Sequence, residues 1–320
     1  MILSVSRRTD IPAFYPEWFF NRVKEGFVYV RNPMNAHQIS KVEISPRVVD
    51  CIVFWSKNPG PMLGRLDELK EYDYYFQYTV NDYGSEAEPN VPPLDERLET
   101  FVSLSGKIGR ERVIWRYDPV LFSDVYTPER HLKSFSYIAE KLRGYTEKCV
   151  FSLVDVYSSK NSGNLMRLGE KKLFPEELDM FLRGMSDIAK KNGFAIASCA
   201  EGISAEKYGI EHNSCIDKAL IERITGSELD VKPDGQRQFC QCVKCDDIGS
   251  YDTCPHGCVY CYANYRPAVV QDKAGLYDEK SPLLCDSVGE GDKISVRPVR
   301  SYKKKGSGGS GDDPEQLSLF

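Results

Sequence analysis

Six of the eleven cysteines lie between residues 240 and 261. Among them Cys254, Cys258 and Cys261 have the spacing C-x3-C-x2-C, with Tyr260 directly before the last cysteine. Three thiolates on one short loop can bind three irons of a [4Fe–4S] cube, and so short a loop cannot supply a fourth ligand of its own. The spacing therefore predicts an iron–sulfur cluster with one iron open to a ligand from outside the chain.

A second group of cysteines is available for an auxiliary cluster. Cys240 and Cys242 lie close to the first set, Cys199 ends a predicted strand, and Cys215 precedes a predicted helix. A [4Fe–4S] cluster without an open iron needs four thiolates, and we expect these four to supply them, with Cys245 in reserve. Three cysteines have apolar neighbours and are expected to pack as small hydrophobic groups: Cys51, Cys149 and Cys285.

Zinc is the rival metal for the same segment. C-x-C-x2-C followed by C-x3-C-x2-C can form closed tetrahedral sites, and His256 adds a possible ligand. Zinc ribbons, however, favour two C-x2-C knuckles about 15–20 residues apart, which this segment does not offer. We expect His256 to lie beside the ligands or on the surface.

Composition places the chain among globular proteins. Of its 320 residues 41% are hydrophobic and 12% aromatic. No run approaches the roughly 20 apolar residues of a membrane span, and the one before Arg7 is too short for a signal peptide. We expect a cytoplasmic protein, and in that reducing compartment an odd number of cysteines favours metal binding over disulfides. The net charge of −5 gives no global attraction to nucleic acid, although residues 297–305 are locally basic.

Apolar β-branched runs alternate with segments of helical period. The predicted strands cover 2–6, 48–55, 74–80, 112–117, 150–156 and 194–200. Predicted helices cover 127–145, capped by Thr127, and 174–193, ended by Gly193. This order predicts an α/β fold, a partial parallel (β/α)6 TIM-like barrel with a C-terminal cysteine-rich iron–sulfur segment, and a doubly wound sheet is the alternative.

We expect four regions along the chain. They are the barrel body at 1–230, the cysteine-rich segment at 231–270, a C-terminal wrap with a basic end at 271–305, and a flexible linker and tail at 306–320.

Polar residues follow the carboxyl ends of five predicted strands, where α/β folds place their chemistry. Cationic candidates for binding phosphate or carboxylate are Arg7, Arg8, Lys57 and Arg116. Acidic candidates for binding ribose or ammonium groups are Asp10, Asp118 and Glu201. Arg116 and Asp118 could equally form a structural ion pair.

The motif C-x3-C-x-aromatic-C resembles the signature of the radical S-adenosylmethionine (SAM) enzymes. The resemblance implies that the open iron binds SAM, and that one electron, from a donor such as flavodoxin or ferredoxin, cleaves SAM to a 5′-deoxyadenosyl radical. It implies Cys254, Cys258 and Cys261 as cluster ligands. Tyr260, Gly257 and Asn264 would lie at the cofactor. Most members carry this loop after their first strand, whereas here it follows all six predicted strands.

The chain as a whole, over about residues 1–285, resembles a bacterial family with a domain of unknown function, DUF1848. The resemblance rests on "SRRTDIPAFY", "FWSKNP", "RYDP" and "DIGSYDTCPHGCVYCYAN". The phrase "FWSKNP" is also similar to one in relatives of spore photoproduct lyase, which are radical SAM enzymes of DNA repair. The family implies no particular substrate.

The sequence "QLSLF" follows a Gly/Ser-rich linker. It resembles the pentapeptide that binds the bacterial sliding clamp, which implies that Gln316, Leu317, Ser318, Leu319 and Phe320 dock on that partner. A tether of this kind would raise the concentration of the protein on DNA without base-specific contacts.

These observations together predict a cytoplasmic radical SAM enzyme of DNA repair or modification, with DNA or a nucleotide as substrate and no membrane partner. Three alternatives stay open. The same chemistry could act on a small molecule or peptide, the chain could be a zinc-stabilised DNA-associated adaptor without catalysis, or its clusters could be structural or electron-carrying only.

Overall fold

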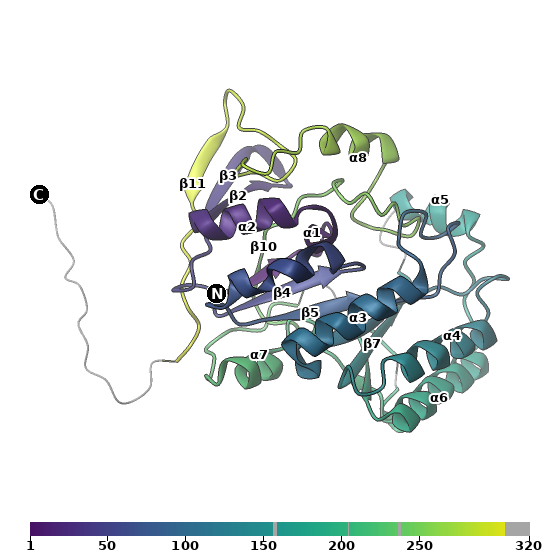
Figure 1. Ribbon diagram of the computed structural model, residues 1–320. Coiled ribbons are helices and arrows are strands. Elements are labelled where there is room, and N and C mark those ends of the chain that lie inside the picture. Colours follow the sequence, from purple (N-terminus) through teal and green to yellow (C-terminus); the bar gives the residue numbers. More distant parts are fainter. Residues whose placement is uncertain (156–158, 204, 236–237, 305–320) are drawn as a thin grey trace, which may run out of the picture.

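The computed structural model describes residues 1–155, 159–203, 205–235 and 238–304. Its centre is an eight-stranded sheet in the order β10-β1-β4-β5-β6-β7-β8-β9, in which all neighbours are parallel (Figure 1). The six longer strands are β1 (Ile2–Val5), β4 (Cys51–Ser56), β5 (Tyr74–Thr79), β6 (Val113–Val120), β7 (Lys148–Leu153) and β8 (Ala195–Ser198). The edge strands are β9 (Glu211–His212) and β10 (Asp246–Asp247).

Helical segments connect the strands of this sheet, as parallel neighbours require. They are α1 (Ile11–Phe14), α2 (Pro16–Glu25), η1 (Gly60–Leu69), α3 (Leu94–Ile108), η2 (Arg110–Arg112), α4 (Pro128–Lys141), α5 (Ser159–Arg167), α6 (Pro175–Asn192), η3 (Glu206–Tyr208) and α7 (Lys218–Thr225). Another helix, α8 (Pro267–Ala274), follows β10 and leads to the second sheet. Thr127 caps α4 by accepting a hydrogen bond from the Arg130 amide, and Gly193 ends α6 in the left-handed conformation.

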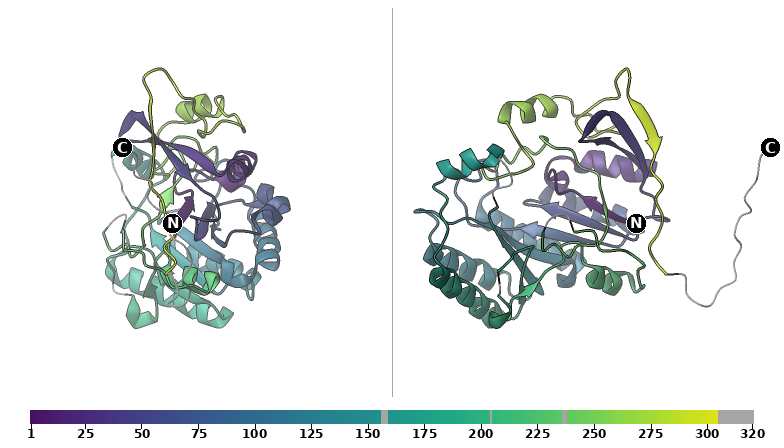
Figure 2. Two further views of the ribbon diagram at one scale, coloured as in Figure 1. Left: turned by 90° about the vertical axis from the view of Figure 1, so that its left-hand side faces the viewer. Right: turned by 180° about the vertical axis from the view of Figure 1, so that it is seen from behind.

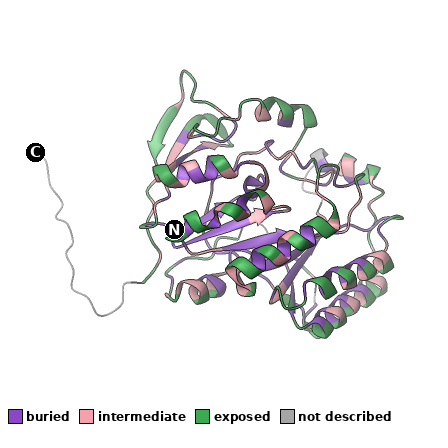
Figure 3. Cartoon of the chain, in the orientation of Figure 1, coloured by how far each residue is buried: buried purple, intermediate pink, exposed green. Residues whose placement is uncertain are grey.

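Alternate residues of the strands enter two different cores. Phe76 and Trp115 belong to the core that α2, α3, α4 and α6 cover, and these helices expose their outer faces (Figure 3). Tyr75 and Ile114 belong to a second core, which is completed by α7 and by residues from 229 to 243 (Figure 2 shows this side). The cysteine-rich segment therefore covers one face of the sheet.

A second sheet of three strands lies against α2. It has the order β11-β3-β2, with β2 (Phe27–Asn32) and β3 (Asn35–Glu43) antiparallel and β11 (Lys293–Val296) parallel to β3. The sequence analysis did not predict these strands. β11 comes from the weakly periodic region 266–300, and it pairs with a strand more than two hundred residues earlier, which local patterns do not encode.

The α/β class and the large parallel sheet are confirmed, and each of the six predicted strands is present. Cys51, Cys149 and Cys285 are buried, as expected of small hydrophobic groups. Curvature into a partial barrel and the boundaries at 230, 270 and 305 stay predictions. The predicted tail peptide lies outside the described residues. No helix in the described ranges is both long and apolar enough to cross a membrane.

A buried histidine links α4 to the end of β6. The His131 ring contacts the hydroxyl of Tyr117 through Nδ1 and the carbonyl of Leu121 through Nε2, each at 2.8 Å. Burial lowers the pKa of His131 from 6.5 to about 4, because the charged ring would lose its hydration.

The free energy of unfolding should therefore fall as the pH is lowered from about 6.5 to about 4, because the unfolded chain protonates His131 first. The His131→Gln variant keeps a donor and an acceptor but does not titrate. Between neutral pH and about pH 4, urea unfolding should show that this variant loses less free energy of unfolding than the wild type, by on the order of 2 kcal/mol. Equal acid sensitivity in both proteins would contradict this account of His131.

Candidate active site

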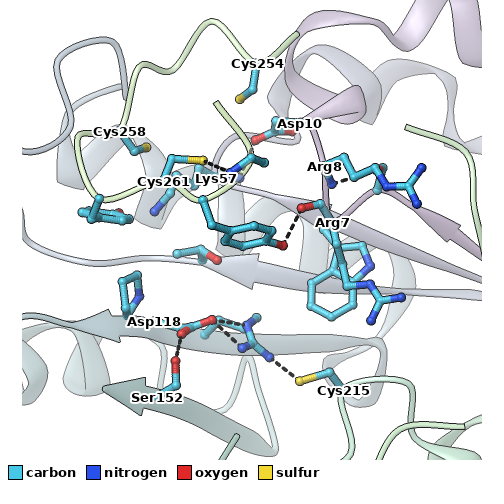
Figure 4. Close-up of a pocket in the computed structure, with 18 of the residues that line it drawn as sticks. Arg7, Arg8, Asp10, Lys57, Asp118, Ser152, Cys215, Cys254, Cys258 and Cys261 are labelled. Atoms are coloured by element: carbon cyan, nitrogen blue, oxygen red, sulfur yellow. Dashed lines mark hydrogen bonds and ion pairs between the residues drawn. The ribbon is translucent and has the colours of Figure 1, made fainter. Parts of the chain in front are cut away.

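A cavity of about 510 Å³ lies at the carboxyl ends of β1, β4, β6 and β7. Its volume falls in the range of ligand-binding pockets. Its lining includes most of the residues that the sequence predicted for the site: Arg7, Arg8, Asp10, Lys57, Arg116, Asp118, Tyr260, Cys199, Cys215, Cys240, Cys242, Cys254, Cys258 and Cys261. Segments far apart in the sequence thus meet at one cavity (Figure 4).

Asp10 anchors the cysteine loop to the sheet. Its carboxylate accepts hydrogen bonds from the Ala13 amide at the start of α1, and from the Ser56 hydroxyl and Lys57 amide after β4. The same carboxylate lies 2.9 Å from Nε2 of His256, inside the cysteine loop. Asp10 therefore joins the ends of two strands to the loop that carries the predicted cluster ligands.

The other side of the loop is fixed by the segment that follows β5. The Asn90 side chain donates to the Pro255 carbonyl at 2.8 Å, and the Asn90 carbonyl contacts Nδ1 of His256. The amide of Val259 donates to the carbonyl of Ala87. His256 is buried between these partners, so the expectation of a surface position is wrong, and its place beside metal ligands stays a prediction.

The three thiols of the loop lie together along one wall (Figure 4). Burial raises the pKa of all three, that of Cys254 to about 12. Backbone amides oppose this effect, from His256 and Asp10 at the Cys254 sulfur and from Ala263 at the Cys261 sulfur, the last at 3.3 Å. Amides aimed at sulfur are typical of iron–sulfur sites, and metal binding would displace the thiol protons.

Behind the loop lies a buried ion pair. The Lys57 ammonium donates to Glu88 at 2.8 Å, and the Tyr260 hydroxyl donates to the same carboxylate oxygen. Burial alone would lower the pKa of Lys57 and raise that of Glu88. The attraction between the two charges is the larger effect, so the pKa of Lys57 is raised and that of Glu88 is lowered. A fixed positive charge therefore lies beside Cys258.

The opposite wall carries the second group of cysteines. The sulfur of Cys199 lies 3.1 Å from that of Cys215, Cys215 hydrogen-bonds Cys242, and Cys242 hydrogen-bonds Cys240. The structure thus brings the four predicted auxiliary ligands together. Cys245 lines a neighbouring cavity instead, where its sulfur accepts from Arg7 at 3.3 Å.

Arg116 connects this wall to the polar floor of the cavity. Its guanidinium donates to the Cys215 sulfur at 2.8 Å and to the Asp118 carboxylate at 2.9 Å. Asp118 also accepts from the Ser152 hydroxyl. Burial would lower the pKa of Arg116, but Asp118 and the nearby cysteines raise it overall, so the guanidinium stays charged. The ion pair considered for Arg116 and Asp118 is therefore present, and it borders the cavity.

Three predicted site residues in the described part of the chain do not line the cavity. Glu201 is buried and accepts a hydrogen bond from the Leu153 amide. Gly257 turns the loop with a φ of 69°, and Asn264 donates to the carbonyl of Cys254 at 2.6 Å. The Asn264 amide oxygen is buried and has no hydrogen-bond partner among the described residues. The roles of these residues at a cofactor stay predictions.

Several residues of the site were not predicted. Glu88 lies in a loop whose acidic residues look solvated in the sequence. Trp55 and Ser152 lie within predicted strands, where alternation alone does not say which face meets a cavity. Asp247 is the first residue of the quoted block "DIGSYDTCPHGCVYCYAN", and its pairing with β1 brings it to the cavity.

In the described part of the chain, no three His, Cys, Asp or Glu side chains converge as the ligands of one metal ion would.

Fold and site together define an α/β protein with two cysteine-lined walls facing one cavity. Residues 2–263 match the family described as "Domain of unknown function (DUF1848)", and the chain belongs to that family. No curated protein matches the chain.

Among solved structures the chain is similar to a putative alpha-L-fucosidase from Bacteroides thetaiotaomicron VPI-5482, with 11% sequence identity and a TM-score of 0.25. The match covers 49% of this chain and 64% of that one. A likeness this weak supports no inference about fold or function.

The buried ion pair at the site gives a stability prediction. Glu88→Gln should lower the free energy of unfolding by about 3 kcal/mol, because it leaves the Lys57 ammonium buried without its counter-charge. Adding Lys57→Met should restore part of this loss. Urea unfolding of the two single variants and the double variant measures the effect.

The control is the exposed pair of Lys207 and Asp179, where Asp179→Asn should change little because water already solvates both groups. If Glu88→Gln were as mild as Asp179→Asn, the charges of Lys57 and Glu88 would not be coupled as described.

Proposed function

We propose that this member of the DUF1848 family is a radical SAM enzyme. The observation that carries the proposal is the position of Cys254, Cys258 and Cys261, three thiols on one wall of a cavity at the carboxyl ends of parallel strands. The group that these thiols would hold is a [4Fe–4S] cluster whose open iron binds SAM and whose electron cleaves SAM to a 5′-deoxyadenosyl radical. The predicted partial barrel would be the large sheet curved around this cavity.

The residues around the loop have roles that their contacts suggest. Glu88 holds the Lys57 ammonium and the Tyr260 hydroxyl in place, so the Tyr260 ring offers a fixed apolar surface beside the thiols. Lys57 supplies a positive charge at the same wall, suited to a carboxylate. Asp10 acts by positioning the loop, since hydrogen bonds within the protein occupy its carboxylate.

Substrate would lie between the two walls. Arg116 and Asp118 present a fixed cation and anion at the cavity floor, and Arg7 and Arg8 add positive charge at its edge. We propose Cys199, Cys215, Cys240 and Cys242 as ligands of an auxiliary [4Fe–4S] cluster. The contact between the Cys199 and Cys215 sulfurs must lengthen when a cluster binds, because the two thiolates would then hold different irons.

We propose DNA or a nucleotide as substrate, a cytoplasmic location, and a flavodoxin or ferredoxin as electron donor. The support is the resemblance of "FWSKNP" to DNA-repair radical SAM enzymes and of residues 316–320 to the clamp-binding peptide. The clamp would hold the enzyme near DNA, which suits a chain with a net charge of −5.

Iron content and SAM cleavage test the proposed chemistry. Protein purified without oxygen should be brown and contain about eight irons per chain, and Cys258→Ala and Cys215→Ala should each lose about four of them. Reduced wild-type protein should release 5′-deoxyadenosine from SAM. Cys258→Ala should lose this release, because only its cluster would have an open iron.

Cys285→Ala is the matched control, because Cys285 is buried outside the cavity and should leave iron content and cleavage unchanged. A colourless protein that contains zinc would support the adaptor alternative and end the catalytic proposal. Brown protein that never cleaves SAM would point to structural or electron-carrying clusters.

A further inference from the structure

A second cavity of about 640 Å³ adjoins the first. It lies between the three-stranded sheet and the β1–β10 edge of the large sheet. Its lining comes from both sides: Arg7, Arg8, Val30, Arg31, Asn32, Pro33, Gln38, Ser40, Asp234, Cys245, Asp246, Asp247, Lys293, Ser295 and Arg297. Arg7, Arg8 and Asp247 line both cavities, so the two share a wall.

The three-stranded sheet presents a polar face to this second cavity. Lys293 of β11 is paired with Gln38 of β3, and Ser295 is paired with Ser40, and all four line the cavity. Residues that alternate with them, such as Lys41, do not line it. A sheet face that lines a cavity of this size with hydroxyl, amide and ammonium groups is suited to a polar ligand rather than to a buried core.

Cationic side chains outnumber acidic ones in this lining by five to three, and ion pairs hold most of the cations in place. Arg31 is fixed by ion pairs with Asp292 and Asp286, which raise its pKa. Lys293 is exposed and has no ion-pair partner in the described part of the chain. Cations spread along the second cavity are suited to binding successive phosphates of one nucleic-acid strand.

Tyrosine rings lie where the second cavity meets the first. Tyr262 is 40% exposed, lines the first cavity, and is held by a 2.7 Å hydrogen bond from its hydroxyl to the Arg7 carbonyl. The Arg8 guanidinium lies 5.1 Å from the Tyr251 ring centroid, and that ring stacks on Tyr265. Exposed rings beside a cationic groove are the combination that binds unpaired bases.

We propose that the second cavity binds the sugar–phosphate backbone of single-stranded nucleic acid and leads one nucleotide past Tyr262 into the first cavity. The delivery step rests on the proposed function, whereas binding of the strand does not. A single strand fits better than a duplex, because a duplex hides the base faces that the tyrosines would stack on.

Fluorescence anisotropy with a labelled oligothymidylate of about 16 nucleotides tests the proposal on the full-length protein. Lys293→Ala should weaken binding several-fold and reduce the slope of log K against log salt concentration by about 0.7, because one phosphate contact is lost. Lys41→Ala removes the same charge from the same sheet outside the groove, and it should bind as the wild type does.

The stacking surface is tested separately. Tyr262→Ala should weaken binding by about 5-fold or more, and Tyr262→Phe should keep most of the affinity because it keeps the ring. Tyr137→Ala is the matched control, since Tyr137 is also 40% exposed and hydrogen-bonded but lies on α4. Iron content of the Tyr262 variants shows whether the adjacent Cys261 ligand is disturbed.

Any one of the following results would overturn the proposal. The Lys293 and Tyr262 variants could bind like the wild type, or poly-glutamate could displace the oligonucleotide as well as unlabelled single strand does. Duplex that binds more tightly than single strand would refute the stacking role. If the protein binds single strands but does not cleave SAM, the proposed chemistry is wrong and the binding proposal stands. If it cleaves SAM but does not bind oligonucleotides, the proposed role of the second cavity is wrong and the proposed chemistry stands.

Discussion

The arrangement of this protein depends on the carboxylate of Asp10. Four hydrogen-bonding groups converge on it, from α1, from the end of β4 and from His256, which is 246 residues later in the chain. A buried carboxylate with such partners is costly to disrupt, because each group would lose a bond that water cannot replace. Through His256 it fixes the only loop with the C-x3-C-x2-C spacing against the ends of the parallel strands. A loop near the C-terminal end of the sequence is thereby held at the carboxyl edge of a sheet whose first strand begins at residue 2.

Two cations lie at the cavity beside its cysteines. The partly buried Lys57 pairs with Glu88 and the buried Arg116 with Asp118, and each of these cations lies beside a wall of cysteines. Burial disfavours thiolates, and these two cations offset part of that cost. The pKa values of the thiols on both walls nevertheless stay raised, as does that of Cys149 outside the walls, where burial is the largest cause.

The sequence predicted what is local and missed what is long-range. Strands and helices followed from period and capping, as at Thr127 and Gly193, and the candidate ligands followed from spacing. Lys57 and Asp118 were predicted to lie at the site because they follow strands, and the carboxyl ends of parallel strands meet at one edge of the sheet. β10 is two residues long and gives no periodic signal, so its pairing with β1 was not foreseen, and neither were the three-stranded sheet and its cavity. Glu88 was missed because only the fold buries it beside Lys57.

The central claim is that the loop around His256 presents an open iron site to the cavity that a second cysteine wall also faces. Electron paramagnetic resonance of the dithionite-reduced protein, recorded with and without SAM, tests it most directly. We expect signals from two clusters, with the spectrum of one changed by SAM and that of the other unchanged. Spectra that SAM leaves identical, or an absence of any cluster signal in protein kept from oxygen, would contradict the account.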